Sequence, residues 1–293
     1  MQWQGELPMV LRSIAYDDVA IEAYKEQISR YTERLEAFGF VYRLYLKDED
    51  AVGLALFGKE PLQLFKPVGT PLARLVVLDY DQPLDVLKEF ADEGLSLAKE
   101  REVDYAYLNI SAGHQDLIAH LRRIGFEELA NRYEMSRPLD ESFEVMDLLR
   151  YEQIQRKDVS KFFECMKEFM SGSPDDVLNL VMKNFSEVPE AILDAWYEGV
   201  QAYFVFHEND LVGILDLVPP DSYIQNIGVS PAHRGKGFGK EMLRFCLKLF
   251  KEGGGKAAGL GVHVKNKRAI HVYEQLGFSV DKQVQTLVWW KPS

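Results

Sequence analysis

The sequence predicts a mixed α+β fold built from two copies of one domain. Three observations carry this prediction: an ordinary globular composition, an internal repeat, and an order of elements in which antiparallel strands precede a strand–helix–strand unit. The 293 residues are 47% hydrophobic and 27% charged, which is typical of a folded globular chain. A domain usually takes about 100–200 residues, so one large or two modest domains are expected.

The internal repeat is the strongest of these observations. Two stretches match without a gap over some fifty residues at an offset of 152, so that the helical segment 84–100 falls on 236–252. Farther along, the Gly-Phe pair 125–126 falls on the pair 277–278. Chance similarity of two α/β segments does not explain a register that is shared by successive strands and helices.

The repeat sets the expected domain limits. We predict a first copy over residues 1–140 and a second copy over residues 141–293. Residues Arg137-Pro138-Leu139-Asp140 lie at the junction. A proline next to charged residues is typical of a short linker.

Periodicity predicts the elements of the second copy. The expected strands are 143–149, 202–206, 211–217, 223–229, 259–264 and 278–290, and the expected helices are 154–170, 237–252 and 267–276. Glu208-Asn209-Asp210, between two β-rich runs, signals a hairpin. Because hairpin strands come first and a strand–helix–strand unit follows, we expect a twisted mixed sheet flanked by helices rather than a doubly wound sheet.

The charge of the chain is acidic and uneven. The formal net charge is -12, with 34 Lys+Arg against 46 Asp+Glu, which disfavours nucleic acid as a partner because phosphate contacts need an excess of basic residues. Residues 232–268 reverse the balance, with ten basic and two acidic residues. Most charge runs are solvated faces, but a basic island in an acidic chain also suits a small polyanionic ligand.

Composition also indicates a compartment. Cys165 and Cys246 are too few for a disulfide framework or a cysteine-rich zinc site. The first residues lack the basic stretch and apolar run of a signal peptide, and no uncharged apolar run approaches the roughly 18 residues of a membrane span. We therefore expect a cytoplasmic protein with no metal and no membrane partner, in an oligomeric state that the sequence does not reveal.

A glycine-rich loop, residues 234–240 (Arg-Gly-Lys-Gly-Phe-Gly-Lys), connects a predicted strand to a helix start. Such a loop brings backbone N–H groups and a helix N-terminus to one place, which favours anion binding. Its basic side chains would balance phosphate charge. A Walker loop is excluded because Glu241 follows Lys240, and a dinucleotide fingerprint is excluded because the third glycine is not at the required spacing. A purely structural glycine turn is the remaining alternative.

Two blocks in the second copy resemble one family. Arg234, Gly237 and Gly239 form the string R-x-x-G-x-G after a strand that ends in residues 227–229, and this string resembles the acyl-CoA loop of the GCN5-related N-acetyltransferase (GNAT) superfamily. Residues 266–278 resemble the family segment N-x-x-A-x-x-x-Y-x-x-x-G-F. The resemblance implies two tandem GNAT-like domains, and a sheet that splays beside the glycine loop, where the pantetheine arm inserts like an extra strand.

The resemblance also implies site residues, with acetyl-CoA as the co-substrate. The residues expected to bind it are Ile227, Gly228, Val229, Arg234, Gly235, Lys236, Gly237, Phe238, Gly239, Lys240, Asn266 and Tyr273. Tyr273 is the expected general acid that protonates the departing thiolate, and its alternative is a core tyrosine. Asn266 is the expected contact to the pantetheine arm, and it also suits a helix N-cap.

The general base is not identified by the sequence. Asp216, among apolar neighbours on a predicted strand, is the best carboxylate candidate, with a solvent-facing strand residue as the alternative. His233 and His263 are further candidates by residue type but also suit structural roles, and a water relay is a further alternative. By resemblance, the segment 169–189 corresponds to the acceptor-side helices and is expected to shape the amine pocket.

The first copy lacks these features. Residues 82–87 replace the glycine loop, contain no glycine and include Pro83, which has no N–H to donate. Nearby acids would repel phosphate: they are Asp79, Asp81 and Asp85. At the matched positions, Leu121 replaces Tyr273, His114 replaces Asn266 and Leu56 replaces Asp216. We expect a degenerate copy that supports the second or completes an acceptor cleft.

Three functions stay open at this point. The first is an acetyl-CoA-dependent N-acetyltransferase that acts through the second copy on a small amine or peptide acceptor. The second is a non-catalytic acyl-CoA-binding or partner-binding module, which the missing base favours. The third is an aminoacyl transferase that uses tRNA, which the 22 basic and 42 acidic residues of segment 1–231 disfavour.

Overall fold

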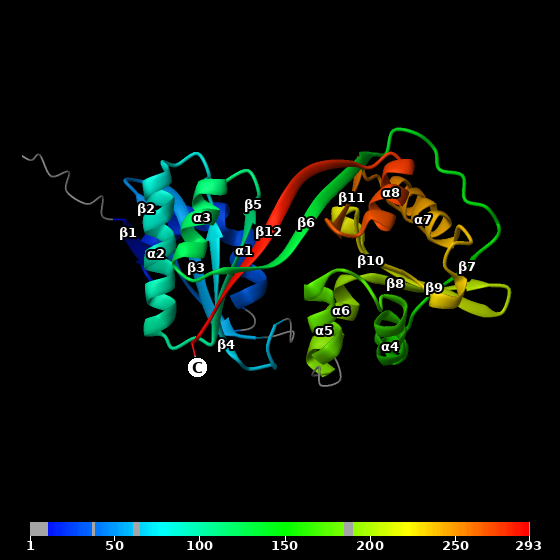
Figure 1. Ribbon diagram of the computed structural model, residues 1–293, viewed down its shortest axis with the longest axis horizontal. Helices are drawn as coiled ribbons and strands as arrows, with labels where there is room; N and C mark the ends of the chain where they lie inside the picture. The colour runs from blue at the N-terminus through cyan, green and yellow to red at the C-terminus, as the bar shows by residue number, and fades with distance from the viewer. Residues whose placement is uncertain (1–10, 37–38, 61–64, 185–189, 293) are drawn as a thin grey trace, which may run out of the picture. The chain divides into compact units, whose positions relative to one another are not determined.

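The computed structural model describes residues 11–36, 39–60, 65–184 and 190–292, which divide into two compact units (Figure 1). Unit 2 contains Phe65 and Ala130–Val284, and unit 1 contains the other described residues, including those from Gln285 onward. None of the helices in the described ranges is both long and apolar enough to cross a membrane.

Unit 1 is a mixed sheet with helices on it. Its elements are β1 (Arg12–Ala15), α1 (Lys25–Glu36), β2 (Val41–Lys47), β3 (Asp50–Lys59), β4 (Pro71–Val77), α2 (Leu84–Glu100), β5 (Tyr105–Ser111) and α3 (Gln115–Arg123). The strand order is β1-β2-β3-β4-β5-β12, where β12 (Ser279–Trp290) enters this unit with its end from Gln285 onward. β1 to β4 are antiparallel neighbours, whereas β4 and β5 run parallel. Helices α2 and α3 bury their apolar stripes on one sheet face around Phe90 and Leu121.

Unit 2 repeats this plan. Its elements are β6 (Glu127–Pro138), β7 (Arg150–Gln153), α4 (Val159–Phe169), α5 (Asp176–Asn184), α6 (Glu190–Gly199), β8 (Gln201–His207), β9 (Asp210–Val218), β10 (Tyr223–Val229), α7 (Phe238–Glu252), β11 (Ala257–His263), α8 (Lys267–Gln275) and β12 (Ser279–Trp290). The strand order is β6-β11-β10-β9-β8-β7. Only β10 and β11 pair in parallel among the strand pairs described for this unit.

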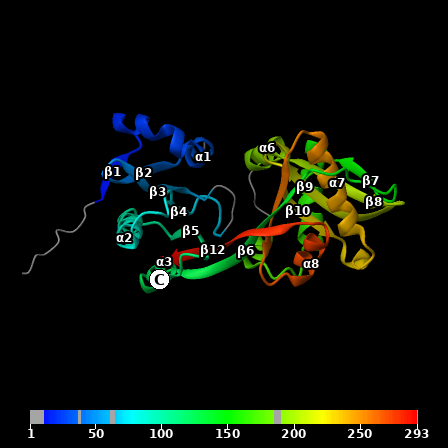
Figure 2. The same ribbon diagram turned by 90° about the horizontal axis from the view of Figure 1, so that it is seen from above.

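Helices cover both faces of the unit 2 sheet (Figures 1 and 2). α7 and α8 pack on one face, where Met242, Leu247 and Tyr273 join the core. α4 and α6 pack on the other face around Phe162 and Leu193. Burying a large apolar side chain stabilises a fold by roughly 1.5–3 kcal/mol, so these two layers hold the sheet from both sides.

Each unit is completed by a strand from the other copy of the repeat. Residues 130–138 of β6 belong to unit 2, where they pair antiparallel with β11 from Ala257↔Pro138 to His263↔Arg132. The end of β12 belongs to unit 1, where Leu287 and Trp289 enter the core. The units in space therefore differ from the sequence repeat, whose limits of 1–140 and 141–293 stay a prediction.

Most elements predicted for the second copy are confirmed from β8 to β12, with ends shifted by a few residues. The helix predicted from residue 154 begins only at Val159, because residues 155–158 form a capped 3₁₀ turn first. The hairpin of β8 and β9 is present, and Glu208 takes a positive φ of 55° in its turn.

Two local predictions are wrong. Residues 143–149 are not a strand: the Met146 N–H donates to the side chain of Glu241, and Leu149 is buried in the core beside α7. Their apolar pattern therefore serves packing rather than sheet pairing. Residues 137–140 are not a free linker, because Arg137 and Pro138 are the last residues of β6.

Candidate functional site

The two parallel strands of unit 2 separate after a short contact. β10 pairs with β11 only at Tyr223↔Gly259 and Ile224↔Leu260, although β10 continues to Val229. A register shift against β9 between Ile224 and Asn226 marks a β-bulge, and bulges end pairing and redirect side chains. The free edge of β10 beyond the bulge is thus able to hydrogen-bond an extended ligand as an added strand does.

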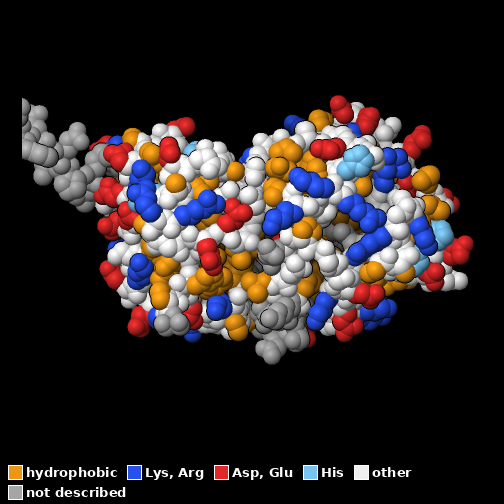
Figure 3. Space-filling model, in the orientation of Figure 1, with side chains coloured by type: hydrophobic (Ala, Val, Ile, Leu, Met, Phe, Trp, Pro, Cys, Tyr) orange, Lys and Arg blue, Asp and Glu red, His pale blue; other side chains and the backbone are white. Residues whose placement is uncertain are grey.

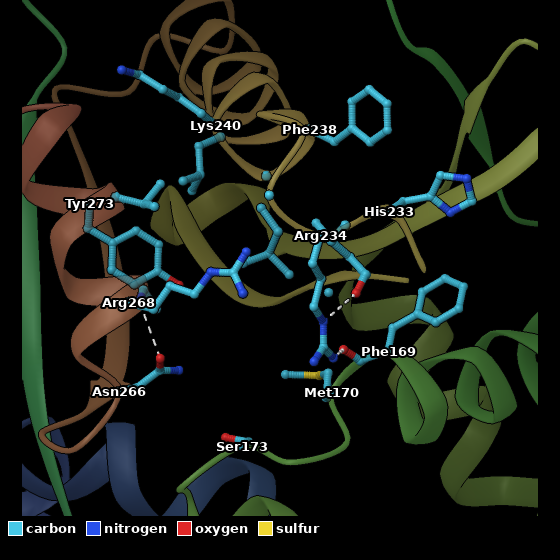
Figure 4. A pocket seen from close by; sticks show the side chains of 18 of the residues that line it. Phe169, Met170, Ser173, His233, Arg234, Phe238, Lys240, Asn266, Arg268 and Tyr273 are labelled. Atoms are coloured by element: carbon cyan, nitrogen blue, oxygen red, sulfur yellow. Dashed lines mark hydrogen bonds between the residues drawn. The ribbon is translucent and has the colours of Figure 1, made fainter. Parts of the chain in front are cut away.

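A cavity of about 600 Å³ lies at this separation (Figure 4). It is lined by the end of α4 and the segment after it, the end of β10, the glycine loop, and the starts of α7 and α8. The lining residues are Phe169, Met170, Ser171, Gly172, Ser173, Pro174, Ile227, Gly228, Val229, His233, Arg234, Gly235, Gly237, Phe238, Gly239, Lys240, Leu243, Asn266, Arg268, Ala269, Val272, Tyr273 and Gln275. This set has no Asp or Glu, so the cavity favours an anionic, partly apolar ligand.

The glycine loop presents unpaired backbone donors. Gly235 and Gly237 have φ values of 81° and 88°, a conformation that glycine adopts without steric cost. The N–H groups of residues 235–239 donate to no acceptor in the part of the chain that the structure describes. They lie at the N-terminus of α7, which begins at Phe238. Converging N–H groups at a helix N-terminus form an anion-binding site.

Basic side chains surround this loop, and Figure 3 shows Lys and Arg gathered over the unit 2 part of the visible face. Lys240 and Arg268 line the cavity, and an Arg268 Nη2 atom lies 4.0 Å from where a Cβ on Gly235 would stand. Lys236, expected as a ligand, is exposed and is not among the lining residues. Arg268 was not singled out from the sequence, and its place in the basic island was the only signal for it.

Arg234 makes contacts that the sequence did not predict. Its Nε donates to the Val229 carbonyl at 3.2 Å, and its Nη2 donates to the carbonyls of Phe169 at 2.8 Å and Ser171 at 3.4 Å. Figure 4 shows the guanidinium directed toward the end of α4. The side chain that was expected to balance phosphate charge is therefore engaged with backbone carbonyls.

Tyr273 projects from α8 into the cavity (Figure 4). It is 8% exposed, and its ring packs against Phe278 at a centroid distance of 6.0 Å. Burial, with smaller contributions from Cys246 and Tyr223, raises the pKa of Tyr273 to about 12. The phenol therefore keeps its proton at neutral pH and is able to donate it.

Asn266 combines the two roles considered for it. Its Oδ1 accepts a hydrogen bond from the Ala269 N–H at 3.2 Å, so the side chain caps α8. It also lines the cavity. The cap fixes the side chain, which leaves its amide nitrogen available for a ligand.

Asp216 lies one strand behind the cavity. It is fully buried on β9 and is not among the lining residues, so the solvent-facing alternative is wrong. Asn226, its partner across the β9–β10 pair, donates from Nδ2 to Asp216 Oδ2 at 3.0 Å. Burial raises the pKa of Asp216 to about 7, although the hydrogen bonds from Asn226 act in the opposite direction.

The two histidine candidates are in different places. His233 lines the cavity, and its Nδ1 lies 3.5 Å from Ser230 Oγ. His263 is buried and outside the lining, and its Nδ1 accepts from the Lys265 N–H at 3.2 Å. That bond requires an unprotonated Nδ1, which indicates a structural role for His263.

Part of the predicted acceptor segment lines the same cavity. Residues 169–174 connect α4 to α5 and form its wall. A Cβ on Gly228 would lie 3.2 Å from Phe169 Cβ and 3.3 Å from Met170 Cγ, so only glycine lets this segment approach β10 so closely. Residues 185–189 of the predicted segment lie outside the described residues.

The matching strands of unit 1 stay paired over a longer stretch. β4 and β5 pair over four residues, from Leu72↔Tyr105 to Leu75↔Leu108. Tyr80 stacks on His114 at a centroid distance of 4.3 Å, and its hydroxyl donates to the Asn109 carbonyl at 3.4 Å. His114 stands where Asn266 stands in the second copy, so an aromatic pair occupies the place of a ligand contact.

A comparison with protein families covers the same part of the chain as this site. Residues 167–278 match the sequence model of the Acetyltransferase (GNAT) family. Residues 167–278 thus carry the sequence pattern of this family. The resemblance stated from the glycine loop and the Asn266–Phe278 block is therefore confirmed, and the match contains the whole cavity lining.

Solved structures extend the likeness to the whole chain. A tandem GNAT protein from the clavulanic acid biosynthesis pathway has a TM-score of 0.63 and 13% identity, covering 97% of this chain and 100% of that one. A GCN5-related N-acetyltransferase from Sphaerobacter thermophilus has a TM-score of 0.58 and 14% identity, covering 86% and 81%. At such identity the likeness shows the fold, and it confirms two tandem GNAT-like domains.

Curated relatives match a shorter part of the chain. Mycothiol acetyltransferase of Corynebacterium efficiens is 32% identical over 88 residues, which are 29% of this chain and 30% of that protein. Streptothricin acetyltransferase of Streptomyces lavendulae is 39% identical over 56 residues, which are 19% of this chain and 30% of that protein. The chain thus matches less than a third of the length of these relatives, and both are named acetyltransferases.

Proposed function

We propose that this chain is an acetyl-CoA-dependent N-acetyltransferase with its active site in unit 2, acting on a primary amine of a small molecule or peptide. One observation carries the proposal: the separation of β10 from β11 opens a cavity that holds both the unpaired N–H groups of the glycine loop and the protonated Tyr273. The family and the names of the curated relatives support it.

The proposed donor site uses the groups around the cavity. The free edge of β10 at residues 227–229 holds the pantetheine arm, with a further contact from Asn266. The backbone of residues 234–240 and the N-terminus of α7 hold the diphosphate. The open space beside Gly237, where a Cβ would meet nothing within 4 Å, and the unpaired N–H groups fit such a ligand, because they leave room and donors at one place.

The proposed reaction is direct transfer. The amine nitrogen attacks the thioester carbonyl, a C–N bond forms, and the C–S bond breaks. A backbone N–H of β10 stabilises the developing oxyanion. Tyr273 donates its proton to the leaving thiolate. A base accepts the proton that the amine loses, so one proton is given and one is taken up.

Asp216 is our proposed base. A base works best when its pKa lies near the working pH, and the raised pKa of Asp216, about 7, meets that condition. Because the carboxylate is buried behind Asn226, a water relay completes the path from the amine.

The test combines binding and product analysis. Titration calorimetry with acetyl-CoA is expected to show one site, and mass spectrometry of an amine library with acetyl-CoA is expected to show products 42 Da heavier, roughly the mass of an added acetyl group. Absence of acetyl-CoA binding contradicts the proposal. The library also identifies the acceptor.

A second candidate is a non-catalytic acyl-CoA-binding module. It is favoured by one observation: no Asp or Glu is among the lining residues of the cavity. The Tyr273→Phe variant separates the two candidates, because an enzyme loses turnover, whereas a binding module never consumes acetyl-CoA with either residue.

A further inference from the structure

We propose that the Arg234 side chain is a positioning residue that ties the acceptor-side segment 169–174 to the acyl-CoA loop, and that Lys240 and Arg268 carry the charge facing the donor phosphates. The role of Lys240 and Arg268 rests on the proposed function, because it assumes an acyl-CoA ligand. The role of Arg234 does not rest on it. Basic residues that share one cavity thus have different roles.

Arg234 hydrogen-bonds two segments of the chain at once. Its three acceptors are backbone carbonyls, one at the end of β10 and two at the end of α4, more than sixty residues away in sequence. A helix ends with carbonyls that lack an intrahelical donor, and its C-terminus attracts positive charge. Arg234 supplies both the donor and the charge to the end of α4.

The segment that Arg234 holds also has hydrogen bonds to its own neighbours: Asn179 Nδ2 donates to the Ser173 carbonyl at 3.0 Å, and the Asp175 N–H donates to Ser173 Oγ at 3.3 Å. After α4 ends, Ser171 and Ser173 donate to the carbonyls of Glu168 and Met170 at 3.2 Å each. The segment packs on the backbone of Gly228, which the side chains of Phe169 and Met170 approach closely. Because the segment lines the cavity, its position sets the shape of the wall on the side opposite the glycine loop.

The positive charges of Lys240 and Arg268 lie where we propose that the donor phosphates bind. Lys240 lies in the first turn of α7 and Arg268 in the first turn of α8, and both line the cavity. No salt bridge involves either residue among the described side chains. An arginine without a partner is free to bind phosphate oxygens through two parallel hydrogen bonds.

Hydrogen exchange and calorimetry test the division of roles. Arg234→Met keeps the aliphatic stem and removes the donors, Arg234→Lys keeps donors and charge, and Arg268→Met is the matched control. In the ligand-free protein, we expect Arg234→Met to speed exchange at the amides of residues 170–173 by roughly ten- to a hundredfold. Arg234→Lys restores part of the protection, and Arg268→Met leaves it unchanged.

Binding of CoA supplies the second readout. We expect Arg268→Met to raise the Kd for CoA by about tenfold or more. Arg234→Met is expected to change this Kd by less than about threefold. Faster exchange confined to residues 170–173 distinguishes the tie from a general loss of stability, which would also reach α7 and β11.

Three results overturn the proposal. They are unchanged exchange in Arg234→Met, a loss of CoA binding in Arg234→Met as large as in Arg268→Met, and unchanged CoA binding in Arg268→Met. If the unmodified protein does not bind CoA, the proposed function fails, whereas the exchange experiment still decides whether Arg234 holds the segment.

Discussion

The parallel strand pairs of the two units show how one strand order gives different local geometry in the two copies. β4 and β5 stay paired over four residues without a register shift between β3 and β4, whereas β10 and β11 part after two beside a bulge. In unit 1, Tyr80 stacks on His114, which matches Asn266 in the repeat. The site therefore depends on local backbone irregularity and on glycine, which a shared strand order does not provide.

The largest expected effect comes from Tyr273, the proposed general acid, whose counterpart in the first copy is Leu121. Tyr273→Phe removes the only proton that this ring is able to donate, so kcat is expected to fall by about 10²–10⁴. The Kd for acetyl-CoA changes little. Steady-state kinetics and calorimetry measure the two quantities. Tyr203→Phe, whose hydroxyl bonds Gln201 in the same unit, is the control and should retain activity; unchanged kcat in Tyr273→Phe removes Tyr273 from the mechanism.

A pH dependence is expected from Asp216, which has no counterpart because Leu56 stands at its position. An acid with a raised pKa stays protonated in the folded state while the unfolded state ionises. Its stabilising contribution is therefore complete below about pH 4 and is lost as the pH rises to about 7, by up to about 4 kcal/mol. As the proposed base it must be ionised in the folded state, so activity should rise around pH 7.

Asp216→Asn tests both readouts. Urea denaturation between pH 4 and 8 is expected to show a flatter stability profile in the variant than in the unmodified protein. The variant is also expected to lose the rise of kcat near pH 7. An unchanged activity profile excludes Asp216 as the base, even if the stability profile flattens.

An aspartate at the glycine loop makes the second copy like the first, since Asp85 matches Gly237. Gly237→Asp forces a side chain into a φ of 88° and places a negative charge at the phosphate site. We expect the Kd for acetyl-CoA to weaken by at least about tenfold. The reciprocal Asp85→Gly variant should leave binding unchanged, because Tyr80 still stacks on His114 in unit 1. Equal affinity of Gly237→Asp would show that the loop does not bind the donor.

The smallest expected effect is on the aromatic pair of unit 1. Tyr80→Ala removes the stack on His114 and the bond to Asn109, which is expected to lower the free energy of unfolding by about 1–2 kcal/mol. Urea denaturation measures this loss. Acetyl-CoA stoichiometry should stay at one site per chain. A second site would mean that the aromatic pair alone keeps acetyl-CoA out of unit 1.

The sequence predicts what depends on local spacing. The glycine loop, the Asn266–Tyr273 helix and the strands from β8 to β12 follow from periodicity and motif position, and the structure confirms those elements. The strand predicted at residues 143–149 is absent, because the apolar side chains of this segment pack beside α7 and do not pair with another strand.

Long-range contacts are what the sequence does not predict. Arg234 meets the carbonyls of Phe169 and Ser171 only because the fold brings α4 to the end of β10. The burial of Asp216 likewise depends on β10 and the helices that cover β9, not on its own neighbours in sequence. In both cases the residue type suggested a polar function, but the contacts of the side chain depend on segments that are distant in sequence.

The exchange of closing strands has a consequence for how the chain can be divided. Residues 130–138, from the first copy of the repeat, give unit 2 its strand next to β11, and Arg137 among them donates to the Leu276 carbonyl at the end of α8. A deletion at the repeat boundary would remove that strand from the helix that carries Tyr273. A chain cut at the repeat boundary therefore separates β11 and α8 from a strand and an arginine that they contact in the intact protein.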